Sequence, residues 1–120
     1  MEKLYIASTS KTLEFVDVLA KKSQVQITLN KDEATIMLYV IDVESKISLT
    51  NEIFESSKNP NIHTIFQIIP EGMDFYQKKA LTEFAEELKH LGVFVIVDND
   101  IMKSVNQVHS IARIFDPQLN

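Results

Sequence analysis

Apolar residues gather in five short segments along the chain, and each segment has the length and residue types of a β-strand. Residues 25–29 alternate between apolar and polar, with Val25, Ile27 and Leu29 apolar, which is typical of a half-exposed edge strand. Residues 34–41 are almost continuously apolar and rich in β-branched types, which predicts a central strand covered on both faces. The predicted strands are residues 3–7, 25–29, 34–41, 63–69 and 93–97.

Between these strands, apolar residues recur at helical spacing. Residues 13–20 show this spacing behind Ser8, Thr9 and Ser10, whose hydroxyls can cap the start of a helix. Ser48 can cap a second, short helix that runs to about residue 57.

The third helix has the strongest amphipathic pattern and should end at Gly92, because glycine readily adopts the left-handed conformation that follows a helix. A fourth helix is expected over residues 101–115, before Pro117. The apolar positions that define the third helix are Phe75, Leu81, Phe84, Ala85, Leu88 and Leu91.

Strands that alternate with helices imply a parallel sheet with helices on both faces. Five strands and about four helices predict a flavodoxin-like α/β sandwich of three layers, with strand order 2-1-3-4-5 and one domain over residues 1–120. In this topology a ligand crevice is expected at the carboxyl ends of the first and third strands. The residues that follow those two strands are therefore the first candidates for function.

Composition limits the classes of function. The formal net charge of −5 argues against binding to nucleic-acid polymers or anionic membranes, because both require a concentrated positive field. The longest apolar run is far shorter than the roughly 20 residues of a membrane span. Cysteine is absent and the first residues carry no signal-peptide pattern, so a cytoplasmic location is expected.

Two carboxylates stand out at the predicted crevice. Asp42 closes the central strand, and Glu52 falls in the first turn of the next helix. The two carboxyl groups of such a pair can take different roles, one ionised and acting as a nucleophile and the other protonated and acting as an acid. The competing interpretation is that Asp42 ends a loop and Glu52 complements the helix dipole.

The remaining polar residues have weaker signals. Hydroxyls of Ser8, Thr9 and Ser10 at a helix start could bind a phosphate or ribose, but plain capping of that helix is favoured. Residues 98–100 (Asp-Asn-Asp) could hold a cation, but capping of the last helix is favoured. The three histidines have no ligand spacing, so no metal site is predicted. No cofactor is predicted either, because neither glycine-rich phosphate-binding fingerprint is present.

Three segments resemble the nucleoside 2-deoxyribosyltransferase-like family, small flavodoxin-like proteins of bacteria and phages. They are residues 4–8, 33–42 and 51–53. The resemblance implies that Glu52 is the nucleophile on the sugar, that Asp42 donates a proton to or binds the base, and that Tyr5 orients the glutamate. It also implies that Asn51, with the hydroxyls after the first strand, contacts a nucleoside or nucleotide, and it favours a homodimer.

The same order of elements resembles Toll/interleukin receptor domains, whose enzymatic forms use a comparable glutamate to split the nicotinamide–ribose bond of NAD. Both resemblances imply chemistry at N-glycosidic bonds. The family usually surrounds its glutamate with glycines and a preceding aspartate, and residues 48–54 contain neither. A non-catalytic module that senses a nucleotide or binds a protein is therefore the alternative hypothesis.

Overall fold

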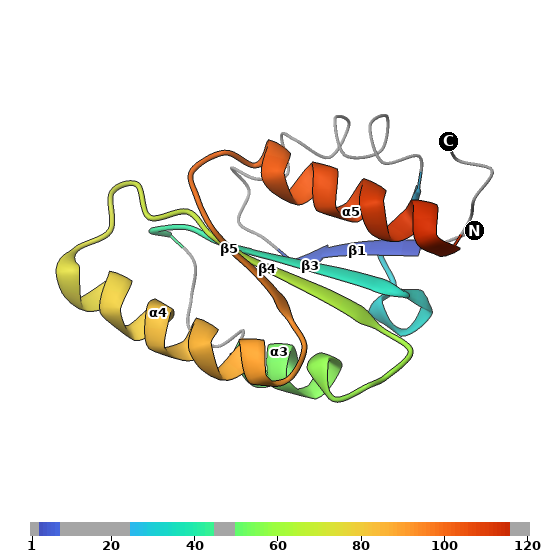
Figure 1. Ribbon diagram of the computed structural model, residues 1–120, viewed down its shortest axis with the longest axis horizontal. Coiled ribbons are helices and arrows are strands. Elements are labelled where there is room, and N and C mark those ends of the chain that lie inside the picture. Colours follow the sequence, from blue (N-terminus) through green and yellow to red (C-terminus); the bar gives the residue numbers. More distant parts are fainter. Residues whose placement is uncertain (1–2, 8–24, 45–49, 116–120) are drawn as a thin grey trace.

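The computed structural model describes residues 3–7, 25–44 and 50–115, and its strands form one parallel sheet. The strand order is β2-β1-β3-β4-β5, as the sequence predicts, so the flavodoxin-like α/β architecture is confirmed (Figure 1). The strands are β1 (Lys3–Ala7), β2 (Gln26–Ile27), β3 (Ile36–Ile41), β4 (His63–Ile68) and β5 (Phe94–Val97).

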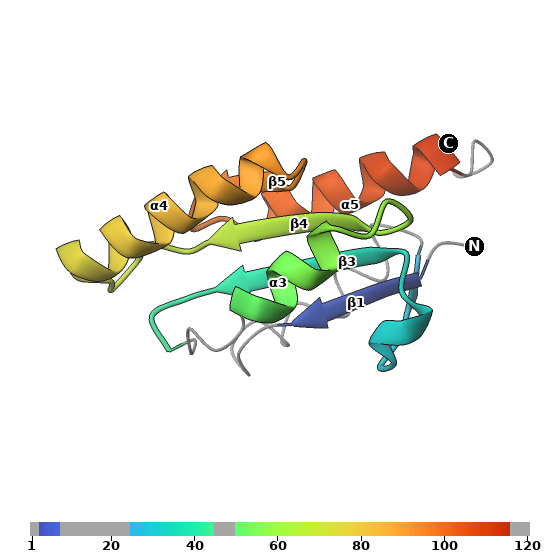
Figure 2. The same ribbon diagram turned by 90° about the horizontal axis from the view of Figure 1, so that it is seen from below.

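Helices cover both faces of the sheet. α3 (Thr50–Ser57) and α4 (Phe75–His90) lie on one face and α5 (Met102–Phe115) on the other (Figures 1 and 2). The helix expected over residues 13–20 and the cap expected at Ser48 lie outside the described residues. None of the helices in the described ranges is both long enough and apolar enough to cross a membrane.

The sheet divides the hydrophobic core into two layers, because successive side chains of a strand point to opposite faces. The α5 face buries Leu38 and Ile65 of the central strands against α5. The other face buries Tyr39 and Phe66 against α3 and α4. All six residues of β3 are buried, so the prediction of a central strand covered on both sides is confirmed.

The edge strand β2 is shorter than predicted. The backbone N–H of Thr28 donates to the carbonyl of Leu4 at 2.9 Å, and the chain then leaves the sheet. Thr28 is therefore buried and Leu29 is 95% exposed, although the alternation predicted the reverse. The short 3-10 helix η1 (Lys31–Glu33) follows, with Asn30 as its N-cap, and the sequence pattern did not predict it.

Two positions in the predicted apolar stripe of the third helix face solvent. Asp74 caps α4 by accepting a hydrogen bond from the N–H of Gln77, so Phe75 lies in the first turn and is 72% exposed. Leu91 is the C-cap residue and is also exposed. Gly92 follows with φ +87°, a conformation that favours glycine, as predicted.

Candidate functional site

The carboxyl end of β3 places Asp42 where the predicted crevice begins. Asp42 is 7% exposed, and its Oδ1 accepts a hydrogen bond from the N–H of Glu44 at 2.9 Å. Aspartate side chains commonly form turns by accepting a hydrogen bond from the backbone N–H two residues later. Here this bond turns the chain out of the sheet. Asp42 therefore has a structural role in the turn, and this role agrees with the loop-ending interpretation of its carboxylate.

The helix after this turn contains Glu52 in its first turn, as predicted, although the description of the structure does not extend to the Glu52 side chain. Its neighbour Asn51 is exposed and lines a hollow of about 390 Å³ between α3, β3 and η1. The other residues that line this α3 hollow are Lys31, Asp32, Met37, Tyr39, Glu55, Ser56, Asn59 and Ile62.

A chain of hydroxyl groups joins β3 to α3 at the α3 hollow. The Tyr39 hydroxyl donates to Ser56 Oγ at 3.2 Å, and Ser56 Oγ donates to the carbonyl of Ile53 at 3.1 Å. Tyr39 is almost fully buried, so the interpretation of its ring as a core residue is consistent with the structure, while its hydroxyl fixes the distance between strand and helix. The α3 hollow thus has one rigid side.

Tyr5 lies on the same face of the sheet as the α3 hollow. It pairs in register with Met37, which lines the hollow, and its half-buried side chain packs against the core under α3 and α4. The structure therefore brings Tyr5 and Asn51 to one face of the sheet. Ser8, Thr9 and Ser10 lie outside the described residues, and their predicted role stays a prediction.

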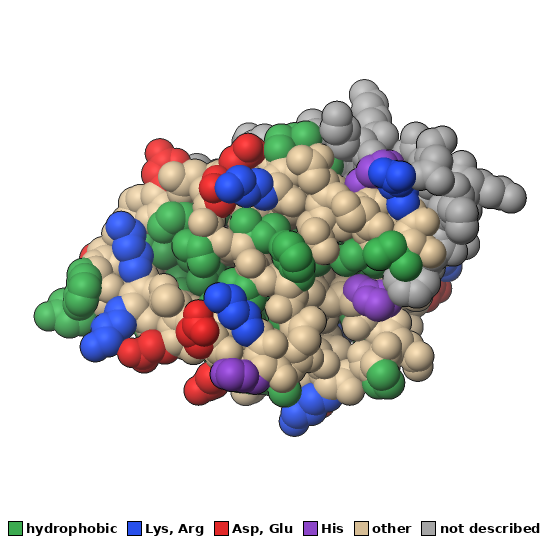
Figure 3. All heavy atoms as spheres, in the orientation of Figure 1, with side chains coloured by type: hydrophobic (Ala, Val, Ile, Leu, Met, Phe, Trp, Pro, Cys, Tyr) green, Lys and Arg blue, Asp and Glu red, His purple; other side chains and the backbone are tan. Residues whose placement is uncertain are grey.

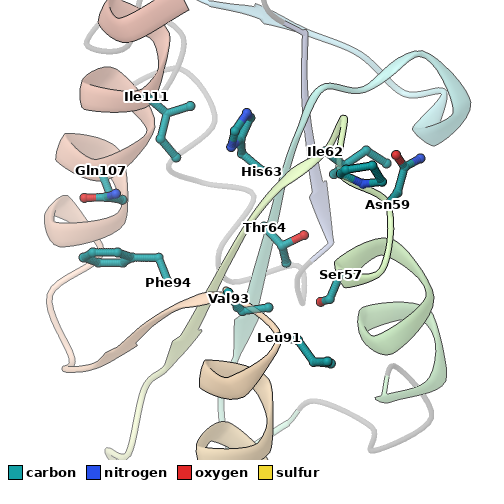
Figure 4. A pocket seen from close by; sticks show the side chains of 12 residues that line it. Ser57, Asn59, Ile62, His63, Thr64, Leu91, Val93, Phe94, Gln107 and Ile111 are labelled. Carbon is teal, nitrogen blue, oxygen red and sulfur yellow. The ribbon is translucent and has the colours of Figure 1, made fainter.

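A second hollow of about 320 Å³ lies at the amino ends of β4 and β5 and shares Asn59 and Ile62 with the α3 hollow (Figure 4). Thr64 is 7% exposed, and its Oγ1 has no hydrogen-bond partner among the described residues. No motif in the sequence marks this amino-edge hollow, because loops distant along the chain assemble it. It is lined by Ser57, Asn59, Pro60, Ile62, His63, Thr64, Leu91, Gly92, Val93, Phe94, Gln107 and Ile111.

The Asp-Asn-Asp segment after β5 acts as a cap, which was the favoured interpretation. Asp98 Oδ1 accepts from the N–H of Asp100 at 2.7 Å, and Asp100 Oδ1 accepts from the N–H of Met102 at 2.9 Å. Asn99 Oδ1 accepts from the N–H of Glu71 at 3.0 Å and ties this loop to the loop after β4. These side chains organise the start of α5.

An ion pair in this loop predicts a pH dependence. Lys103 Nζ lies 2.6 Å from Asp98 Oδ2, and this hydrogen bond, together with the N–H of Asp100, holds the pKa of Asp98 below its ordinary value of 3.8. Because the folded pKa is the lower one, the pair stabilises the fold above pH 3.8, and this contribution is lost as the pH falls through the folded pKa. In a Lys103→Gln variant, carboxyl NMR titration should show the pKa of Asp98 rising toward 3.8. An unchanged pKa would contradict the pairing.

Comparisons with known proteins add little to this geometry. No family model matches the chain, and no curated protein matches it. A solved structure of a de novo designed Rossmann fold protein aligns with 96% of this chain and 97% of its own, at 18% identity and a TM-score of 0.47. The class of the protein therefore follows from its own sheet, which is a five-stranded parallel sheet of flavodoxin-like order.

Proposed function

We propose that the chain binds a nucleoside or nucleotide in the α3 hollow and acts on its N-glycosidic bond through Glu52. The observation that carries the proposal is the position of Asn51, next to Glu52 in α3, on the wall of a hollow that has a suitable size. Small-molecule sites usually span about 300–1,000 Å³ and combine apolar walls with a few fixed polar groups.

The chemistry of the α3 hollow suits such a ligand. Met37 and Ile62 offer apolar surface for a base, while Asn51 and Asn59 offer amide groups that can donate to and accept from a base edge or sugar hydroxyls. Glu55 adds a carboxylate that can accept from a ribose hydroxyl. The ligand class therefore rests on this chain's own side chains as well as on the family resemblance.

In the proposed reaction, the Glu52 carboxylate forms a bond to the anomeric carbon as the bond from that carbon to the base nitrogen breaks. The resemblance assigns the proton that the departing base takes up to Asp42 and the orientation of the glutamate to Tyr5, both of which lie outside the lining of the α3 hollow. An acceptor base or water then attacks the same carbon and gives its proton to the Asp42 carboxylate, which releases Glu52 as a carboxylate and restores the acid. The reaction is a transfer or a hydrolysis and needs no metal ion.

The test measures the release of free base by chromatography, with deoxynucleosides plus an acceptor base and separately with NAD. We expect release by the wild-type chain and a loss of at least about a hundredfold in Glu52→Gln, since an amide is a poor nucleophile. Glu87→Gln on the exposed side of α4 is the matched control and should retain the rate. An Asn51→Ala variant should bind the ligand more weakly.

A thermal-shift series with the same compounds separates catalysis from binding. A ligand that binds only the folded state adds about 2.7 kcal/mol of stability at one hundred times its Kd. Stabilisation without base release would support the non-catalytic nucleotide sensor, which the engagement of Asp42 in its turn favours. If neither response occurs with any of these compounds, the α3 hollow is not a nucleoside site.

A further inference from the structure

The open edge of the sheet at β5 is an unusual surface for a small α/β chain. β5 reads Phe94-Val95-Ile96-Val97 and contains no charged residue and no proline, the two features that commonly protect an edge strand from pairing. Phe94 is 47% exposed and Val97 is 56% exposed. Figure 3 looks onto this edge and shows hydrophobic side chains gathered across its middle, with charged side chains above and below.

The backbone of β5 has hydrogen-bonding groups that point to this edge. The N–H of Asp98 donates to the carbonyl of Ile68 at 3.0 Å, which identifies the side of β5 that faces β4. In a parallel strand alternate residues direct their backbone groups to the same neighbour, so Phe94 and Ile96 also face β4. Val95 and Val97 therefore direct their N–H and C=O groups to the open edge, and no strand in the described ranges lies beyond it.

We propose that two copies of this chain associate by antiparallel pairing of β5 with β5, about a twofold axis at Ile96. In this register Val95 lies opposite Val97 of the partner subunit. Val95 of each copy then exchanges two hydrogen bonds with Val97 of the other copy, because the N–H and the C=O of both residues point to the open edge. The pairing joins the two sheets into one continuous sheet.

Side chains at this edge are self-complementary as well. Val95 and Val97 lie on the α4 face of the sheet. In the antiparallel pair, the side chain of Val95 in one copy lies beside the side chain of Val97 in the other. Phe94 lies on the α5 face with Ile96, and it packs diagonally against Ile96 of the partner subunit. The association therefore covers the half-exposed apolar side chains on both faces.

The charges beside β5 favour a second copy as the occupant. On α4, Lys89 Nζ lies 3.0 Å from Glu86 Oε1, and at the end of β5 Lys103 pairs with Asp98. Both pairs are locally neutral, although the whole chain has a net charge of −5. Each pair brings a lysine to the flank of β5, so two identical edges approach with less repulsion than the net charge of −5 alone would produce.

The oligomeric state of the full chain tests this inference by light scattering after size exclusion. At concentrations from about 5 to about 500 µM, where interfaces of modest size associate, we expect a mass of twice 13.7 kDa. Val97→Lys should give a monomer, because it places a charge on the paired edge. Leu29→Lys is the matched control at the opposite edge of the sheet, where Leu29 is 95% exposed, and it should leave the dimer intact.

Two further measurements keep the test decisive if Val97→Lys folds poorly. Val97→Pro removes one outward N–H from an edge position that tolerates proline, and it should also give a monomer. Amide hydrogen exchange of the wild-type chain should show Val95 and Val97 slowed about tenfold or more at high concentration relative to dilute samples, with Phe94 and Ile96 protected at both. A wild-type monomer throughout, a dimer that survives both Val97 variants, or a dimer dissolved by Leu29→Lys would overturn the proposal.

Discussion

Replacing Phe66 by alanine is expected to lower the free energy of unfolding by about 3–5 kcal/mol. Phe66 lies on β4 and is completely buried, and its ring meets the edge of Phe84 with centroids 5.7 Å apart. Phe84 in turn packs against Phe54 of α3 at 4.8 Å, so the three rings join both helices to the sheet. Alanine would leave a cavity at this junction, which the surrounding backbone can close only in part.

Urea denaturation measures the change, and Phe75→Ala provides the matched control. Phe75 is the same residue type in an aromatic contact of similar distance, 5.7 Å to Tyr76, but it is 72% exposed. Its replacement should alter the free energy of unfolding by no more than about 0.5 kcal/mol. Since domains of this size have about 5–15 kcal/mol of stability, the two variants should differ visibly. Equal losses would show that Phe66 does not occupy the core as described.

The order of the sheet could be predicted because its signals are local. β3 is an almost continuous apolar run, and the amphipathic repeat of α4 covers three buried positions, Leu81, Ala85 and Leu88. Both patterns follow from burial against a neighbouring layer, so they are visible in the sequence. Parallel pairing and short connections then leave few arrangements of five strands.

The ends of the elements could not be predicted in the same way. An apolar repeat does not show where a helix passes beyond the sheet, and Figure 1 shows the amino-terminal end of α4 reaching past it. Phe75 at that end consequently faces solvent. Similarly, the alternation in residues 25–29 did not show where the strand ends. The last backbone hydrogen bond of this segment to β1 runs from the N–H of Thr28 to the carbonyl of Leu4, and the chain leaves the sheet after it.

The candidate site was predictable only in part. The resemblance implied a role for Tyr5 and Asn51, and both lie on the α3 face of the sheet, but the α3 hollow extends toward the amino ends of β3 and β4 and not into the predicted crevice at the carboxyl ends of β1 and β3. The walls of the α3 hollow include Lys31 and Asn59, which no motif connects, because they meet only after the chain has folded. The amino-edge hollow is assembled from loops in the same way, and its buried Thr64 hydroxyl gave no signal in the sequence.

Gln67 is expected to be as important for stability as the aromatic core, although it is polar. It is completely buried, and its Nε2 donates to the carbonyls of Asp98 at 2.8 Å and Asp100 at 3.0 Å, while its Oε1 accepts from the hydroxyl of Ser104. This one amide thereby connects β4 with the capping loop and with α5. Gln67→Leu would leave two carbonyls and a buried hydroxyl without this partner, at a cost of about 3–4 kcal/mol.

A double-mutant cycle distinguishes this network from simple packing. Ser104→Ala alone should cost about 1–3 kcal/mol, because it leaves the amide oxygen of Gln67 without its donor. The double variant Gln67→Leu/Ser104→Ala removes both partners, so its loss should be smaller than the sum of the single losses by about 0.5–3 kcal/mol. Ser110→Ala, an exposed serine of the same helix that bonds to the Asn106 carbonyl, should change stability by less than about 0.5 kcal/mol. Additive losses in the cycle would mean that the side chains of Gln67 and Ser104 do not interact.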